Sequence, residues 1–104
     1  MEKEEIYKIL DQLIIKNTPR TQLIKTVEEL SELQKAICKY LLYGETRHID
    51  QIVEKFVDVN IMLIQLEMIL LVSLGNNEKL TEQFNYKMNR IKESLNEEKN
   101  NSNQ

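Results

Sequence analysis

The sequence predicts an all-α protein. It contains 104 residues, of which only two are glycine and one is proline. A sheet protein of this length needs many turns, and turns draw on glycine, proline, asparagine and aspartate for their special backbone angles. Hydrophobic residues make up 41% of the chain and charged residues 30%, which is typical of a folded protein with an apolar core. Long helices joined by few turns are therefore expected.

Four helices follow from the positions of the helix-breaking residues and from apolar residues at helical spacing. Thr18 and Pro19 form an N-cap and a first helical position, and they open the second helix. Gly44 closes that helix, and Gly75 closes the third. The predicted helices cover about residues 3–17, 19–43, 49–74 and 77–95.

The second helix is predicted to be amphipathic, with one buried apolar seam. That seam consists of Leu23, Val27, Leu30, Ile37 and Leu41. A single all-α domain is predicted over residues 1–95. Residues 96–104 carry no apolar side chain and are predicted to form a disordered tail.

The third helix is apolar on nearly every side over residues 61–74. A membrane span is one explanation, but it needs about 18 apolar residues without charges, and Glu67 interrupts the run. A helix that is apolar all round must be covered all round, and four helices of this length cannot cover one of their number completely. A second subunit is the economical cover, so a homodimer or a dimer of dimers is predicted.

Composition narrows the function classes further. The net charge is −3 and the pI about 5.2, so no nucleic-acid surface is expected. One cysteine, Cys38, and one histidine, His48, exclude an intrachain disulfide, a cysteine-based zinc site and a multi-histidine metal cluster. The N-terminus is too acidic for a signal peptide, so we expect a cytoplasmic protein without a membrane partner.

Acidic residues gather in two short runs. Residues 28–32 read Glu-Glu-Leu-Ser-Glu, and residues 54–58 read Glu-Lys-Phe-Val-Asp. The first and last carboxylates of each run lie one helical turn apart, and such pairs repel by about a few tenths of a kcal/mol unless a positive charge lies between them. Solvated helix faces with surface ion pairs are the simplest explanation of both runs.

Asp58 is the most informative residue because it directly precedes the apolar stretch of the third helix. An unpaired carboxylate there costs several kcal/mol, so we expect it to be protonated, paired with a cation or bound to a metal. A lysine or tyrosine of a partner subunit would satisfy it equally well. Oxygen ligands without suitable histidine or cysteine partners favour Mg²⁺ or Mn²⁺.

Two segments resemble the MazG-like, all-α nucleotide pyrophosphohydrolase family, in the short form frequent in bacteria and their phages. They are residues 28–37, Glu-Glu-Leu-Ser-Glu-Leu-Gln-Lys-Ala-Ile, and residues 58–66, Asp-Val-Asn-Ile-Met-Leu-Ile-Gln-Leu. The family pattern is Glu-Glu-x-x-Glu on one helix and Glu-x-x-Asp on the next. Residues 86–92 are similar to the family's last helix. The match covers about residues 20–95 and implies a four-helix bundle within an intertwined homo-oligomer.

The resemblance also implies an Mg²⁺-dependent enzyme that cleaves NTP or dNTP to monophosphate and pyrophosphate. The family's four metal-binding positions fall on Glu29, Glu32, Lys55 and Asp58. A lysine ammonium cannot ligate Mg²⁺. Glu29, Glu32 and Asp58 are therefore the predicted metal ligands, with Mn²⁺ as the alternative ion.

Further roles follow from the same resemblance. Glu28 and Glu54 are candidate catalytic carboxylates, which would orient or deprotonate a water molecule. The candidate phosphate-binding residues are Lys35, Lys39, Lys87 and Arg90.

Two other functions stay open. One is a catalytically impaired nucleotide-binding or regulatory homologue, because Lys55 stands at a metal-ligand position. The other is a structural helical interaction protein whose charged residues are only solvated.

Overall fold

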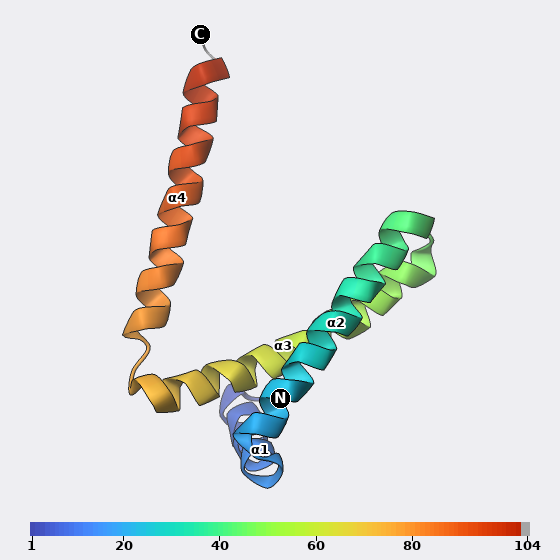
Figure 1. Ribbon diagram of the computed structural model, residues 1–104, viewed down its shortest axis with the longest axis vertical. Helices are drawn as coiled ribbons and strands as arrows, with labels where there is room; N and C mark the ends of the chain where they lie inside the picture. The colour runs from blue at the N-terminus through green and yellow to red at the C-terminus, as the bar shows by residue number, and fades with distance from the viewer. Residues whose placement is uncertain (103–104) are drawn as a thin grey trace. The chain divides into compact units, whose positions relative to one another are not determined.

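The computed structural model describes residues 1–102, which form four α-helices and no strand (Figure 1). The helices are α1 (Lys3–Asn17), α2 (Pro19–Tyr43), α3 (Thr46–Leu74) and α4 (Glu78–Ser102). The predicted all-α class and helix order are confirmed. One compact unit spans Met1–Leu70, and a second begins at Leu71. The single domain over residues 1–95 stays a prediction.

The turns fall at the predicted helix breakers. Thr18 caps α2 through its Oγ1, which accepts a hydrogen bond from the Thr21 backbone N at 3.4 Å, and Pro19 is the first helical residue. The backbone of Thr18 has φ 77° and ψ 149°, a region populated almost only by glycine, so this cap is strained. Gly44 closes α2 at φ 64°, and its N–H donates to the Tyr40 carbonyl at 2.7 Å.

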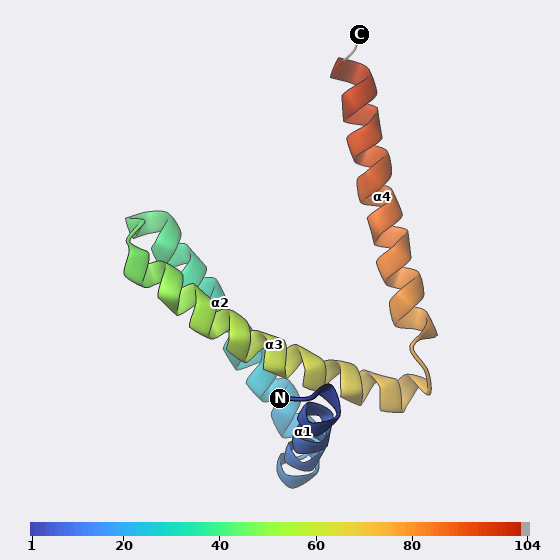
Figure 2. The same cartoon turned by 180° about the vertical axis from the view of Figure 1, so that it is seen from behind.

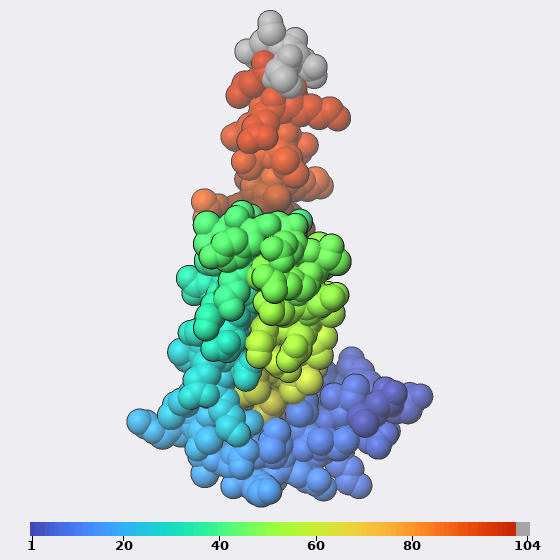
Figure 3. Space-filling view, turned by 90° about the vertical axis from the view of Figure 1, so that its right-hand side faces the viewer, coloured from blue at the N-terminus to red at the C-terminus, as the bar shows by residue number. Residues whose placement is uncertain are grey.

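In the first unit, α2 and α3 form a hairpin of antiparallel helices that lie side by side (Figures 1 and 2). The space-filling view shows the two helices adjacent along the hairpin, with α1 at the end opposite the Gly44 turn (Figure 3). The buried apolar residues of this unit are Leu10, Ile14, Ala36, Val59 and Met62.

A chain of polar contacts ties the base of the hairpin together. The Asn17 Nδ2 donates to the Gln22 Oε1 at 3.1 Å, and the Gln22 Nε2 donates to the Gln65 Oε1 at 2.6 Å. Both glutamines are only 1% exposed. Thr26 is also buried and donates its hydroxyl to the Gln22 carbonyl at 2.8 Å. Polar groups on α2 therefore face α3 at this level.

The prediction that α2 buries its apolar stripe in this chain is wrong. Leu23 is 39% exposed, Val27 64% and Leu41 76%, while α2 buries Gln22, Thr26 and Ala36. The physical reason is the glutamine pair. Two buried amides must satisfy each other, so they turn the polar face of α2 toward α3 and leave the apolar stripe on the outer side.

The α3 helix is the one helix within residues 1–102 that is long and apolar enough to cross a membrane. Of its most apolar 18 residues, 17% are buried. Core helices of soluble proteins pass the same criterion of length and composition, so this feature alone does not assign a location.

The second unit contains α4, which extends beyond its predicted end. The sequence predicts disorder from residue 96, but the helix continues to Ser102, and residues 103–104 lie outside the described part. Residues 96–102 contain no glycine or proline, and their glutamate and lysine residues are good helix formers. The apolar side chains of α4 are largely exposed, with Phe84 at 66% and Leu95 at 60%.

Candidate functional site

The glutamine pair sets the register of the hairpin and thereby aligns the two acidic runs. Gln22 bonds Gln65, and seven residues correspond to about two helical turns. Because the helices are antiparallel (Figure 2), Glu29 lies at the level of Asp58, two turns from the glutamines. The first and second acidic runs therefore lie at the same level, in the middle of the hairpin.

The three glutamates of α2 lie in different environments. Glu28 and Glu32 are exposed, whereas Glu29 is half-buried. The Glu29 Oε2 is buried and has no hydrogen-bond partner. A buried oxygen without a partner costs about 1–3 kcal/mol. Such a cost is typical of a group that is kept for a ligand or a partner subunit rather than for stability.

Asp58 is half-exposed and paired. The Lys55 Nζ lies 3.9 Å from the Asp58 Oδ2, and the two side chains are 30% and 41% exposed. Of the three states expected for Asp58, the structure therefore has the ion pair. A pair with this exposure contributes less than about 1 kcal/mol to stability.

The arrangement does not fit a divalent ion held jointly by Glu29, Glu32 and Asp58 within one chain. The unpartnered Glu29 Oε2 is an oxygen that a cation would satisfy. However, Lys55 already supplies the positive charge at Asp58. Among residues 1–102, no group of three or more Asp, Glu, His or Cys side chains is placed to hold a metal. Mg²⁺ stays a prediction.

An open pocket lies between α2 and α3, one helical turn from Glu29 toward the Gly44 end. It has a volume of about 230 Å³. Its lining includes Glu32, Lys35, Lys39 and Glu54, all of them predicted site residues, and also Ala36, Gln51 and Lys55. Sequence reasoning missed Gln51, although its position opposite Ala36 follows once the hairpin register is known. Glu28 and Asp58 do not line this pocket.

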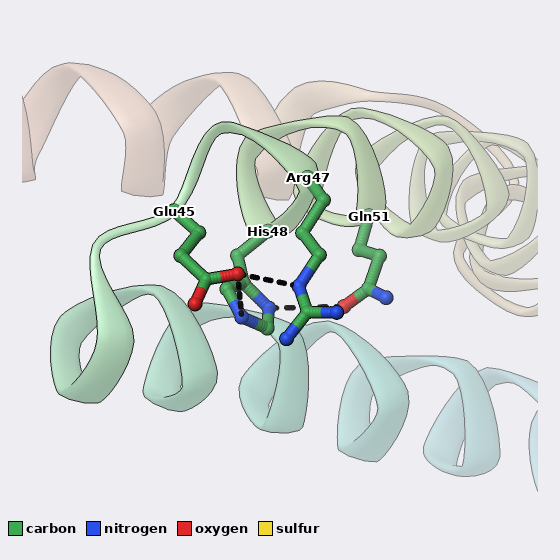
Figure 4. Close-up of polar contacts among 4 residues, drawn as sticks. All are labelled: Glu45, Arg47, His48 and Gln51. Carbon is green, nitrogen blue, oxygen red and sulfur yellow. Dashed lines mark hydrogen bonds and ion pairs between the residues drawn. The ribbon is translucent and has the colours of Figure 1, made fainter.

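A polar cluster at the start of α3 was also missed (Figure 4). The Glu45 Oε2 lies 2.6 Å from the Arg47 Nε and 4.0 Å from the His48 Nε2. The His48 Nδ1 lies 3.4 Å from the Gln51 Oε1, and its ring centroid lies 5.7 Å from that of Tyr43. His48 is only 5% exposed. A lone histidine gives no motif, so only its burial and contacts reveal the cluster.

Two predicted phosphate-binding residues, Lys87 and Arg90, lie on α4 in the second unit. They line a shallow surface depression together with Ile91, Ser94 and Leu95. The Arg90 guanidinium lies 5.9 Å from the centroid of the Tyr86 ring, which is a cation–π distance. Their role in binding phosphate stays a prediction.

Comparisons with known proteins found no matching family model, no matching curated protein and no matching solved structure. The resemblance to the MazG-like family therefore rests on the residues of the two acidic runs and their order in the chain.

Proposed function

We propose that the chain is a MazG-like nucleotide pyrophosphohydrolase that cleaves NTP or dNTP to monophosphate and pyrophosphate, with Mg²⁺ as the metal that the resemblance implies. One observation carries the proposal. The register from Gln22 and Gln65 puts Glu29 level with Asp58, and the Glu29 Oε2 is buried without a partner. Both acidic runs of the family pattern thus lie on facing helices.

The chain's own residues supply two parts of the chemistry. A water oxygen bonds to the α-phosphorus, the bond from that phosphorus to the bridging oxygen breaks, and pyrophosphate leaves. Glu28 or Glu54, both exposed to solvent, accepts the proton of the water as general base. Lys35 and Lys39 flank the inter-helix pocket and neutralise phosphate charge.

A second candidate is a homologue that binds nucleotide without hydrolysing it. The Lys55–Asp58 pair favours this candidate, because the ammonium stands where the family pattern has a metal-binding glutamate. Hydrolysis would then be lost while the anion-binding lysines of the pocket remain.

We also propose that the protein is a homodimer or a dimer of dimers. Apolar side chains of α2 and α3 are exposed in the single chain, with Leu30 at 44%, Ile37 at 41% and Phe56 at 57%. Exposed apolar area of this kind marks an interaction surface. Sedimentation equilibrium should give at least twice the 12.4 kDa of one chain, and Leu30→Asp should lower that mass. A monomeric wild type would contradict this proposal.

The activity test measures pyrophosphate and monophosphate after incubation with each NTP and dNTP in Mg²⁺. We expect turnover that Glu29→Gln and Asp58→Asn each reduce by at least about a hundredfold, because the resemblance implies that each carboxylate binds the metal. Lys55→Glu restores the family pattern and should raise turnover. Lys25→Glu, an equal charge change on an exposed α2 residue outside the pocket, is its control.

Three outcomes separate the candidates. Turnover by the wild type supports the enzyme. Turnover by Lys55→Glu alone supports the impaired homologue. Absence of turnover in both proteins, together with no heat in a titration with a non-hydrolysable nucleotide, would leave only a structural interaction protein.

A further inference from the structure

The pocket between α2 and α3 has the size and composition of a site for part of a ligand. Its volume of about 230 Å³ lies below the range of about 300–1,000 Å³ that is typical of pockets for whole drug-sized molecules. Ala36, a small residue that is 5% exposed, lies among long charged side chains and leaves room between them. A phosphate chain is a ligand fragment of suitable size and charge.

Lysines outnumber glutamates in the lining of this pocket. Three lysines and two glutamates line it, in a chain whose net charge is −3. Within residues 1–102, neither Lys35 nor Lys39 has a carboxylate oxygen at ion-pair distance, and Lys39 is half-buried. An ammonium with reduced hydration and without a counter-ion gains more from an anionic ligand than a fully solvated one does.

An amide donor completes the lining. The Gln51 oxygen is turned to the His48 ring, while its nitrogen is turned away from that ring (Figure 4). Because the Gln51 Oε1 only accepts hydrogen bonds, this contact forms when the His48 Nδ1 carries the proton. The His48 Nε2 is then an acceptor, which agrees with its lack of a partner 4.0 Å from the Glu45 carboxylate. His48 thus orients Gln51 and leaves the amide N–H groups for a ligand.

We propose that this pocket binds the phosphate chain of a polyphosphate ligand through Lys35, Lys39, Lys55 and the Gln51 amide, without a divalent metal. The inference rests on the proposed function only for its ligand class, a nucleotide or its phosphate chain. Lys55, which pairs with Asp58 at 3.9 Å, supplies a tethered positive charge in the region where a metal ion would otherwise be needed. His48 is a positioning residue.

The test is isothermal titration of the full chain with inorganic pyrophosphate and tripolyphosphate, first in EDTA and then in Mg²⁺. We expect binding in EDTA that weakens as salt is added. Lys39→Gln and Lys55→Gln should each lower the affinity about tenfold or more, since each removes one charge-assisted hydrogen bond. Lys16→Gln and Lys25→Gln, at exposed positions outside the pocket, are matched controls and should leave the affinity unchanged.

The role of His48 has its own readout. Loss of the ring-to-amide bond in His48→Ala should weaken pyrophosphate binding, whereas His48→Asn, whose amide nitrogen can donate in place of Nδ1, should restore most of it. Both variants should keep the helical circular dichroism of the wild type. If they then bind pyrophosphate with the same affinity as each other, the positioning role of His48 is wrong.

The outcomes distinguish this inference from the proposed hydrolase function. Nucleotide hydrolysis in Mg²⁺ together with no binding in EDTA would overturn metal-free binding and leave the enzyme intact. Binding in EDTA by a protein without hydrolytic activity would support the inference and count against the enzyme. The inference would be overturned if neither anion bound with or without Mg²⁺. It would also be overturned if Lys39→Gln and Lys55→Gln bound the anions with the affinity of the wild type.

Discussion

Two regions of the α2–α3 hairpin differ in whether their buried polar groups have hydrogen-bond partners. At the base, Gln22 and Gln65 are each 1% exposed and satisfy each other at 2.6 Å. About two turns away, Glu29 keeps a buried oxygen without a partner, and Asp58 has only a 3.9 Å pair with Lys55. A satisfied pair fixes helix register, whereas an unsatisfied group costs stability and persists where a ligand or partner uses it.

The largest expected change in the free energy of unfolding comes from a core substitution at the base of the hairpin, near the glutamine pair. Met62 is 7% exposed, and Met62→Ala should lower the free energy of unfolding by about 2–5 kcal/mol, because it leaves a cavity in the core. Urea unfolding followed by circular dichroism measures the change. Met88→Ala on α4, where Met88 is 48% exposed, should cost less than about 0.5 kcal/mol in a lone chain. A large loss at Met88 would instead indicate that a second copy covers α4.

The glutamine pair itself comes next. Gln65→Leu leaves the buried Gln22 Nε2 without its acceptor, while the Gln22 Oε1 keeps its bond from Asn17, so the free energy of unfolding should fall by about 1–3 kcal/mol. Adding Gln22→Leu removes the orphaned Nε2 but also the acceptor of the Asn17 Nδ2, so it should recover only part of the loss. A double-mutant cycle measures this coupling, and strictly additive losses would contradict the role of the pair as a lock.

In the middle of the hairpin, a substitution is expected to raise the free energy of unfolding instead of lowering it. Glu29→Met removes the buried oxygen that has no partner, so stability should rise by about 1 kcal/mol while any nucleotide hydrolysis falls. Glu28→Met, at the exposed neighbouring position, should change the stability by less than about 0.5 kcal/mol. A loss of stability at Glu29 would show that this oxygen has a partner in solution.

The smallest effect is expected at the ion pair. Asp58→Asn should lower the free energy of unfolding by less than about 1 kcal/mol, because both partners are partly exposed. The difference should shrink as sodium chloride is added, since salt screens exposed charges. A cost of several kcal/mol that is independent of salt would mean that Asp58 is buried in an assembly.

The sequence predicts the turns well and the inward faces poorly. Pro19 and Gly44 mark helix limits because their backbone preferences are local. The end of α4 is misplaced, because the absence of apolar residues in 96–102 does not prevent helix formation. The apolar stripe of α2 is not buried within the single chain, because the pairing of Gln22 with Gln65 joins residues 43 positions apart and leaves no local signal.

The same division applies to the candidate site. The sequence alone identifies two acidic runs on consecutive helices, together with Lys35, Lys39 and the substitution at residue 55, since these depend only on residue type and spacing. Which groups meet is decided by the hairpin register: Lys55 pairs with Asp58, and Gln51 lines the lysine pocket. The physical reason is that helix formation depends on neighbours in sequence, whereas the faces that meet depend on which buried polar groups can satisfy one another across the hairpin.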